Sequence, residues 1–390
     1  EPLAALILFD SCRAGHVECA KAILPLLKPA TINQLLSNTL CHDEAESAKP
    51  SLWSALHLSC YRGFLPLVEL LLQHGAQIDV RTDVGLTPMH YAARQGHLET
   101  VRFLHSMEPG QLAVKSPVNM VAIHAACAGG HLPTVQYLLE QSDELLTWKS
   151  SAGKTPLYYA AEEGRAAVVT QLLEKDTKHA TIHANGGIGP IHAAAAAGHL
   201  DTVKSFLDSF CNGEELSSRS SAGETAFYCA ARYDRLEILR WIGENYPGVT
   251  SMRRLDGCGP MHAAAQGGHV AAIEYLWQLN AAQLSWVSDM GETALHYAAE
   301  HGNLDVVKWI VKKDTNQLST RNAFKKAPIH IAAGEGRLSV VKYLLECNPQ
   351  QVLWLAERNR TPIYYAAREG FRDVTECLLD INAKQVSFRT

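Results

Sequence analysis

The fold of this chain is decided by one stretch, GETALHYAAEHGNL at residues 291–304. Its core pattern, Thr-x-x-His-x-Ala-Ala-x-x-Gly, returns along almost the whole sequence. We call the position of His296 the anchor of a repeat. After a first gap of 48 residues, successive anchors are 33 to 36 residues apart, which indicates a repeat array rather than one large globular core. We number the repeats 1 to 11 by their anchors: Phe9, His57, His90, His124, Tyr158, His192, Tyr228, His262, His296, His330 and Tyr364.

Residues 83–116 show how one repeat is built. Asp83-Val84-Gly85 predicts a turn. Thr87-Pro88 predicts the start of a short helix, because threonine caps free amides and proline suits the first helical position. Gly96 ends that helix, and apolar residues at positions 98, 101 and 104 predict a second, amphipathic one. A glycine or asparagine five residues before most anchors suits a left-handed turn, and Lys325 departs from this rule.

These residues resemble the ankyrin repeat family, whose unit is a β-turn followed by two antiparallel helices. The resemblance covers roughly residues 3–388. It implies an all-α solenoid of stacked helix-turn-helix repeats with β-turn or hairpin fingers, forming one domain over residues 1–390. Two departures predict local distortion rather than another fold. Asp234 replaces the glycine between the two helices, and tyrosine replaces the anchor histidine in repeats 5, 7 and 11.

The repeat pattern breaks in two places. Between the first two anchors, residues 38–50 are polar and lack the apolar stepping of a helix, which predicts an extended finger loop over 38–52. An insertion of this kind projects from one edge of a repeat array, and it either carries function or is a disordered loop. At the other end, residues 386–390 read as the opening of a further repeat, so we expect the sequence to be part of a longer protein.

Composition narrows the classes of function. The net charge of -5 gives no concentrated basic field, so we expect no nucleic-acid partner. The longest early apolar run stops at Asp10, too short to span a membrane. Ten cysteines without a Cys-x-x-Cys pair favour a reducing compartment, and we expect a cytoplasmic location. Three of them occupy a repeat position that holds alanine elsewhere, which predicts small buried side chains: Cys12, Cys60 and Cys127.

The first helices of the repeats alternate in character with a period of two. Odd-numbered repeats carry bulky or charged residues one, four and five positions after the anchor, whereas most even-numbered repeats carry small residues there. By resemblance to the family, these positions face a concave groove that binds partners, together with turn residues four, six and seven before the anchor. Two interpretations stay open. The ridges and hollows seat an extended peptide, or tyrosine and alanine pack complementarily between layers.

We take the odd-repeat residues at these positions as candidate partner contacts, because tyrosine and arginine are enriched in binding hot spots. The candidates are Tyr91, Arg94, Tyr159, Glu162, Glu163, Arg232, Tyr233, Tyr297, Glu300, His301, Tyr365, Arg368 and Glu369.

A second series places an aromatic residue ten positions before an anchor or its expected place, at Trp148, Trp286, Trp354 and Phe388. These residues lie in the predicted fingers. They either bind a partner or cover the edge of the neighbouring layer, and we expect the second role.

Histidines seven residues apart, such as His90 and His97, recur in four repeats. They lie at opposite ends of a short helix, whereas a metal site needs three or four converging ligands, so we expect hydrogen-bonding roles and no metal site. His179 and His183 lack a further ligand, and the acidic residues 42–46 would bind a divalent ion only weakly. The sequence holds no nucleophile elbow, phosphate loop or kinase motif, so we predict no catalytic residue and no cofactor.

The sequence therefore predicts a protein-interaction scaffold or adaptor, not an enzyme, that binds a partner protein or an extended peptide in its concave groove. A small-molecule ligand is not expected. Three alternatives stay open: the substrate-recruiting arm of a larger enzyme, a secreted bacterial effector, and a cytoskeletal or structural spacer.

Overall fold

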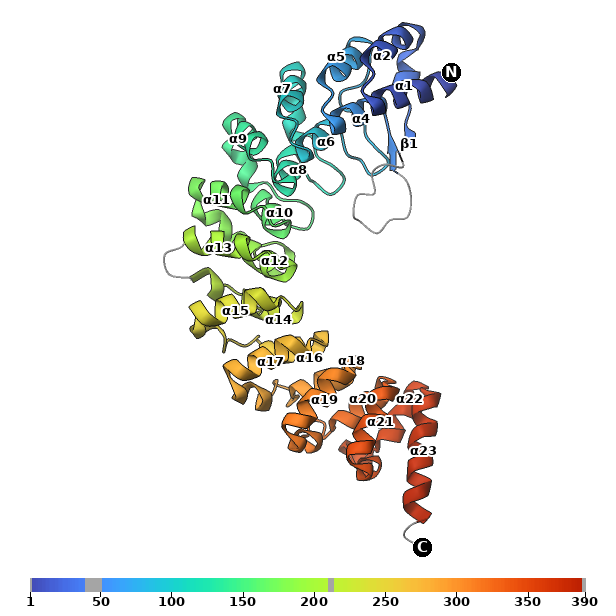
Figure 1. The fold of residues 1–390 in the computed structure, drawn as a ribbon, viewed down its shortest axis with the longest axis vertical. Coiled ribbons are helices and arrows are strands. Elements are labelled where there is room, and N and C mark those ends of the chain that lie inside the picture. The colour runs from blue at the N-terminus through green and yellow to red at the C-terminus, as the bar shows by residue number, and fades with distance from the viewer. Residues whose placement is uncertain (1, 39–50, 210–213, 388–390) are drawn as a thin grey trace. The chain divides into compact units, whose positions relative to one another are not determined.

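The computed structural model describes residues 2–38, 51–209 and 214–387 (Figure 1). After the first repeat, each repeat in these residues is a hairpin of a short inner helix and a longer outer helix, joined to the next repeat by a finger. The predicted all-α repeat fold is confirmed.

The inner helices carry the anchors. They are α1 (Pro2–Ala14), α4 (Ala55–Arg62), α6 (Pro88–Arg94), α8 (Ala122–Gly129), α10 (Pro156–Glu162), α12 (Pro190–Ala197), α14 (Ala226–Arg232), α16 (Pro260–Gly267), α18 (Ala294–His301), α20 (Pro328–Gly334) and α22 (Pro362–Glu369).

The outer helices follow the inner ones. They are α2 (Val17–Ile23), α5 (Leu65–Gln73), α7 (Leu98–Met107), α9 (Leu132–Gln141), α11 (Ala166–Lys175), α13 (Leu200–Ser209), α15 (Leu236–Asn245), α17 (Val270–Leu279), α19 (Leu304–Lys313), α21 (Leu338–Cys347) and α23 (Arg372–Ser387). A short helix, α3 (Pro29–Ile32), completes the first repeat, and 3-10 turns such as η9 (Thr315–Ser319) follow most outer helices.

The ninth repeat shows why these segments are helical. Thr293 caps α18, with its hydroxyl 3.0 Å from Nδ1 of His296, and Gly302 ends the helix in a left-handed conformation at φ 78°. The outer helix α19 then buries one apolar stripe, which includes Val307 and Ile310. Fully burying a side chain of this size stabilises a fold by roughly 1.5–3 kcal/mol, so the stripe holds the hairpin together.

The chain divides into two compact units, residues 1–185 with 204–211 and residues 186–203 with 212–390. Within the first unit, α4, α6, α8 and α10 pack each against the next, and within the second unit the same holds for α12, α14, α16, α18, α20 and α22 (Figure 1). The single continuous solenoid expected over residues 1–390 stays a prediction.

The fingers are tight turns held by backbone hydrogen bonds. In repeat 9, the Ser288 amide donates to the Glu292 carbonyl at 2.9 Å, and Gly291 lies in the left-handed region at φ 73°. Lys325 takes the same conformation at φ 56°, and so does Asp234 between α14 and α15. The distortion expected at Asp234 is therefore absent from the backbone. These two residues adopt a conformation that costs a non-glycine residue of order 1 kcal/mol or more.

The insertion between repeats 1 and 2 begins and ends in a small antiparallel sheet. Strand β1 (Leu36–Asn38) pairs with β2 (Ser51–Trp53), with Leu36 opposite Trp53. The loop predicted over 38–52 therefore has strand residues at both ends, a feature that the sequence pattern missed. Its central residues, 39–50, lie outside the described residues. Trp53 is 1% exposed and packs in one buried cluster with Phe9, Leu58 and Tyr91.

The last helix corrects the expectation for the end of the chain. Residues 386 and 387, where the pattern predicted the opening of a further finger, are the last residues of α23. Phe388, the fourth member of the aromatic series, lies outside the described residues. In the part of the chain that the structure describes, no helix has the length and apolar character that crossing a membrane requires.

Candidate functional site

The anchor histidines link each repeat to the one that follows. In repeat 8, the backbone N–H of Gly259 donates to His262 Nδ1 at 3.1 Å. Because Nδ1 accepts this bond, the ring hydrogen lies on Nε2, which donates to the carbonyls of Trp286 and Glu292 in repeat 9 at 3.1 and 3.2 Å. The same two-sided arrangement recurs at His57, His90, His124, His192, His296 and His330.

In two of the pairs, the second histidine contacts the preceding repeat. His97 Nε2 lies 2.9 Å from the carbonyl of Tyr61, and His269 Nε2 lies 2.9 Å from the carbonyl of Arg232, each in the preceding repeat. Where this position holds another residue, Arg165 or Asn303 makes the equivalent bond. The pairs His90/His97 and His262/His269 thus join their repeat to both of its neighbours. Among the described residues, no group of three or more metal-ligating side chains is placed to hold an ion.

Burial keeps the anchor histidines neutral. An imidazole that leaves water loses the solvation of its charged form, which lowers its pKa. Burial lowers the pKa of His90, and it lowers the pKa to about 4 at His57, His124, His262, His296 and His330. The protonated ring could no longer accept the backbone bond at Nδ1, so these links depend on neutral imidazole.

The candidate tyrosines one position after the anchor pack on the histidine of the preceding repeat. Tyr297 meets His262 edge-on, with ring centroids 5.6 Å apart and an interplanar angle of 89°. Tyr91, Tyr159 and Tyr365 repeat this geometry against His57, His124 and His330 at 5.7, 5.5 and 6.0 Å. Edge-to-face contacts of this kind contribute about 0.5–1.5 kcal/mol beyond burial. The alternation therefore has a packing role.

Two of these tyrosines offer almost no surface to a partner. Tyr91 is 2% exposed and Tyr365 is 4% exposed. Tyr91 is covered by Trp53, whose ring centroid lies 4.1 Å away and which comes from strand β2. Tyr159 and Tyr297 are half-buried. Direct contact with a partner thus stays a prediction for the more exposed candidates and not for the two buried rings.

In repeats 5 and 7, opposite charges meet across two positions, four residues before and four residues after the anchor. In repeat 5, Lys154 Nζ lies 2.8 Å from Glu162 Oε2 and 4.9 Å from the ring centroid of Tyr158. In repeat 7 the charges are reversed, and Arg232 Nη1 lies 3.3 Å from Glu224 Oε1. Glu162 and Arg232 are among the candidates chosen from the sequence. The position of Lys154 and Glu224 was expected on the same face, but their pairing with the candidates was not predicted.

Repeat 9 carries two like charges instead. Glu292 and Glu300 occupy the same two positions, and Glu335 of repeat 10 lies near Glu300. Burial raises the pKa of Glu300, and the carboxylates of Glu292 and Glu335 raise it further, whereas His301 and Arg337 oppose the effect. Glu292 accepts one hydrogen bond from Asn322 Nδ2 at 2.9 Å.

The remaining candidates lie at the surface of the inner helices. Tyr233 is 49% exposed, Arg94 is half-buried, and Arg368 is paired with its neighbour Glu369. The exposed members of the set are Glu163, Tyr233, His301, Arg368 and Glu369. The structure does not bring the thirteen candidates into one cluster, because they belong to five different repeats.

The finger tryptophans stack on basic residues of the preceding finger. Arg253 lies 4.2 Å above the ring of Trp286, and Lys115 and Arg321 take equivalent places over Trp148 and Trp354 at 5.4 and 4.6 Å. All three indoles are half-buried. This arrangement supports the edge-covering role expected for these three tryptophans. The signal that could have found their partners is the basic residue nine positions before the preceding anchor.

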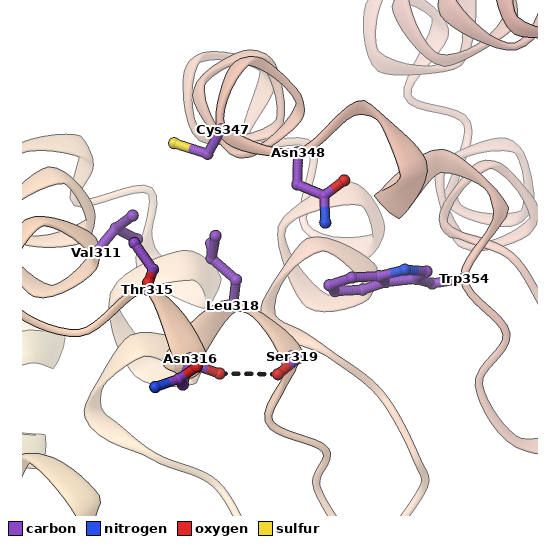
Figure 2. A pocket seen from close by; sticks show the side chains of 8 residues that line it. All are labelled: Val311, Thr315, Asn316, Leu318, Ser319, Cys347, Asn348 and Trp354. Carbon is purple, nitrogen blue, oxygen red and sulfur yellow. Dashed lines mark hydrogen bonds between the residues drawn. The ribbon is translucent and has the colours of Figure 1, made fainter.

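The cavity in Figure 2 lies beside η9, in the second compact unit, and has a volume of about 520 Å³. Two of its polar groups are already engaged in local structure. Ser319 Oγ donates to the carbonyl of Asn316 at 2.9 Å, and Asn348 Oδ1 accepts from the amide of Gln350 at 3.0 Å. The lining residues are Val311, Thr315, Asn316, Leu318, Ser319, Cys347, Asn348 and Trp354. We assign no ligand to this cavity.

The sequence matches family models for ankyrin repeats over most of its length. The model described as ankyrin repeats in three copies matches residues 8–112, 108–185, 244–322 and 313–387, and the model described as ankyrin repeats in many copies matches residues 191–242.

Similar curated proteins share shorter stretches. Protein phosphatase 1 regulatory subunit 27 of Mus musculus is 37% identical over 62 residues, which are 16% of this chain and 40% of that protein. Notch-regulated ankyrin repeat-containing protein A of Danio rerio is 38% identical over 74 residues, 19% of this chain and 66% of that protein. Probable E3 ubiquitin-protein ligase XBOS33 of Oryza sativa subsp. japonica is 43% identical over 51 residues, 13% of this chain and only 10% of that protein.

Proposed function

This chain belongs to the ankyrin repeat family, and from that premise we propose that it is a scaffold or adaptor that binds a partner protein, or an extended peptide of one, on the face formed by its inner helices and fingers. One observation carries the proposal. The backbone of the repeats is constant, while the side chains at equivalent face positions change in charge from repeat to repeat. A constant frame with variable contacts suits recognition of a specific partner.

The names of two relatives also agree with a binding role. The mouse relative is named a regulatory subunit of a phosphatase, and the zebrafish relative is named for its ankyrin repeats and its regulation by Notch. We assign no catalytic role to this chain. The cysteines that the structure describes are free thiols, which supports a reducing compartment such as the cytoplasm.

The rice relative favours one second candidate function. It is named a probable E3 ubiquitin-protein ligase, and its similarity to this chain covers 51 residues. A chain of repeats that recruits a substrate for an enzyme would use the same face as an adaptor. The ligase activity itself is not carried over, because the similarity covers a tenth of that protein.

The test compares two triple variants of the full chain in affinity capture from cell lysate, read by quantitative mass spectrometry. The face variant carries Glu163→Ala, Tyr233→Ala and His301→Ala. The control carries substitutions at exposed positions of the outer helices, Glu237→Ala, Glu274→Ala and Lys312→Ala. All six positions are exposed, so circular dichroism should show that both proteins keep the fold.

We expect the control to retain the same partner proteins as the parent chain and the face variant to lose at least about ninety per cent of them, since truncating a hot-spot residue costs 2 kcal/mol or more. Loss of partner proteins from the control variant alone would show that the partners bind the outer helices. Equal retention by both variants would contradict the proposed face.

A further inference from the structure

Repeats 5 and 7 each contain an ion pair that repeat 9 lacks. In both of these repeats, the side chains four residues before and four residues after the anchor lie within ion-pair distance, at 2.8 Å for Lys154 and Glu162 and at 3.3 Å for Arg232 and Glu224. The two positions therefore face each other on a finger and its inner helix. Each pair neutralises itself, so it presents little net charge to a partner.

Repeat 9 places two carboxylates at the same positions. Glu292 and Glu300 have no lysine or arginine within ion-pair distance in the described part of the chain. Two basic side chains of repeat 10 make other contacts than an ion pair with these carboxylates. Lys326 lies 4.6 Å above the ring of Tyr365, and Arg337 Nε donates to the backbone carbonyl of Glu300 at 2.8 Å.

Apolar side chains are exposed on the same two fingers. Met290 and Phe324 hold the same position in fingers 9 and 10 and are 44% and 45% exposed. The two fingers are joined by a bond from the Ala323 amide to the Met290 carbonyl at 2.7 Å. Asn322 then connects the apolar part to the acidic part, because its Oδ1 accepts from the Phe324 amide at 3.0 Å while its Nδ2 donates to Glu292.

We propose that the face of repeats 9 and 10 binds an extended peptide segment of a partner protein in which a lysine or arginine lies close to a large apolar side chain. The inference rests on the proposed function and specifies the partner's chemistry. The basic side chain lies between Glu292 and Glu300 and supplies the positive charge that Lys154 and Arg232 supply in repeats 5 and 7, and the apolar side chain covers Met290 and Phe324. Burying exposed apolar surface favours the complex, and charge complementarity selects the ligand.

The charges at the same two positions of repeat 11 set the direction in which the peptide segment binds. They hold Arg360 and Arg368, so the charge of the face changes from acidic to basic over two repeats within the second compact unit. Arg360 is stacked 4.6 Å above the ring of Tyr364, and Arg368 is paired with Glu369. Both arginines of repeat 11 therefore already have a partner within the chain. A bound segment places its basic residue on repeat 9 and its more acidic end towards repeat 11.

The experiment selects peptides from a phage-displayed library of random twelve-residue sequences on the full chain. The best peptide is then synthesised with a fluorescent label, and its affinity is measured by fluorescence anisotropy. The test variant carries Glu292→Gln and Glu300→Gln. A matched control, Glu237→Gln with Glu274→Gln, removes the same net charge from exposed positions on the outer helices.

We expect the selected peptides to be enriched in lysine or arginine next to an apolar residue. The affinity for the test variant should fall at least about tenfold and that for the control less than about twofold, while Phe324→Ser weakens binding of the same peptide. Replacing the basic residue of the peptide by glutamine should give a similar loss, with no further loss in the test variant. The melting temperature of the test variant should stay equal or rise, because the substitution removes a repulsion.

Other outcomes would overturn the inference. If the selected peptides lack basic residues, or bind the test variant as tightly as the parent chain, the proposed partner class is wrong. This holds even when the face variant, which carries Glu163→Ala, Tyr233→Ala and His301→Ala, loses its partners. If no peptide is enriched and the face variant also retains every partner, the proposed function fails together with this inference.

Discussion

Repeats 7 and 8 lie in the same compact unit but are joined to the repeat that follows by different chemistry. Repeat 8 uses His262, which is 1% exposed and donates from Nε2 to the carbonyls of Trp286 and Glu292. Repeat 7 uses Tyr228, whose hydroxyl lies 3.4 Å from Nη1 of Arg254. One link is a pair of buried neutral hydrogen bonds, and the other is a phenol beside a cation.

The difference shows which forces each link depends on. Buried hydrogen bonds are strongly sensitive to protonation and weakly sensitive to salt, because no solvent ions reach them. The guanidinium of Arg254 is partly exposed and also pairs with Glu224 and Asp256 at 3.7 and 3.1 Å, so this link depends on screened charges. A histidine-anchored repeat should thus respond to pH, and a tyrosine-anchored repeat should respond to ionic strength.

The largest expected effect is loss of stability in acid. In the folded chain, burial lowers the pKa of five anchor histidines to about 4, whereas a histidine of the unfolded chain has a pKa of about 6.5. Between these values the unfolded state holds more protons, so the free energy of unfolding falls as the pH falls from about 6.5 towards about 4. Each histidine contributes a slope of about 1.4 kcal/mol per pH unit. Five share this pKa: His57, His124, His262, His296 and His330.

Urea unfolding at a series of pH values measures this slope. His262→Gln should lower it by about 1.4 kcal/mol per pH unit, the share of one proton, while Tyr228→Phe leaves it unchanged. A slope that is the same in His262→Gln and in the parent chain would show that His262 is protonated in the folded state, contrary to its burial.

The next effect is the loss of one histidine link at neutral pH. His262→Ala leaves the Gly259 amide and the Trp286 carbonyl without their buried partner and opens a cavity, so we expect a loss of about 3–4 kcal/mol. The matched control is His269→Ala, which removes one partly exposed bond to the Arg232 carbonyl and should cost about 1 kcal/mol. Chemical denaturation of both variants measures the two values, and equal losses would remove the special role of the anchor.

The sequence was enough to predict the repeat frame, because local chemistry sets it. The threonine cap and the glycine end of α18 follow from residues that neighbour each other in the chain, and helix α18 ends one residue before Gly302 as its pattern predicts. Left-handed φ at Lys325 and Asp234 was less predictable, because the surrounding repeat imposes that backbone on residues that do not prefer it.

The candidate face was only partly predictable, because burial depends on neighbours from other segments. Tyr91 and Tyr159 hold equivalent positions, but Tyr91 is covered by Trp53 from a strand that the pattern did not show. The pairing of Lys154 with Glu162 joins residues eight apart across a finger and a helix, a spacing that no helical rule relates. Such pairs become visible once the fold brings the finger against the helix.

The smallest expected effect belongs to the tyrosine link. Tyr228→Phe removes a hydroxyl whose long contact with Arg254 is shared with two carboxylates, so the loss should stay below about 1 kcal/mol. Burial raises the pKa of Tyr228 to about 12, so the phenol is neutral at every pH from 4 to 8 and its removal adds no pH dependence. Because Arg254 is partly exposed, adding salt should shrink the loss further, as urea unfolding at low and high ionic strength can measure. A loss from Tyr228→Phe as large as that from His262→Ala, or one that grows with salt, would mean that the two anchors join their repeats by the same buried chemistry.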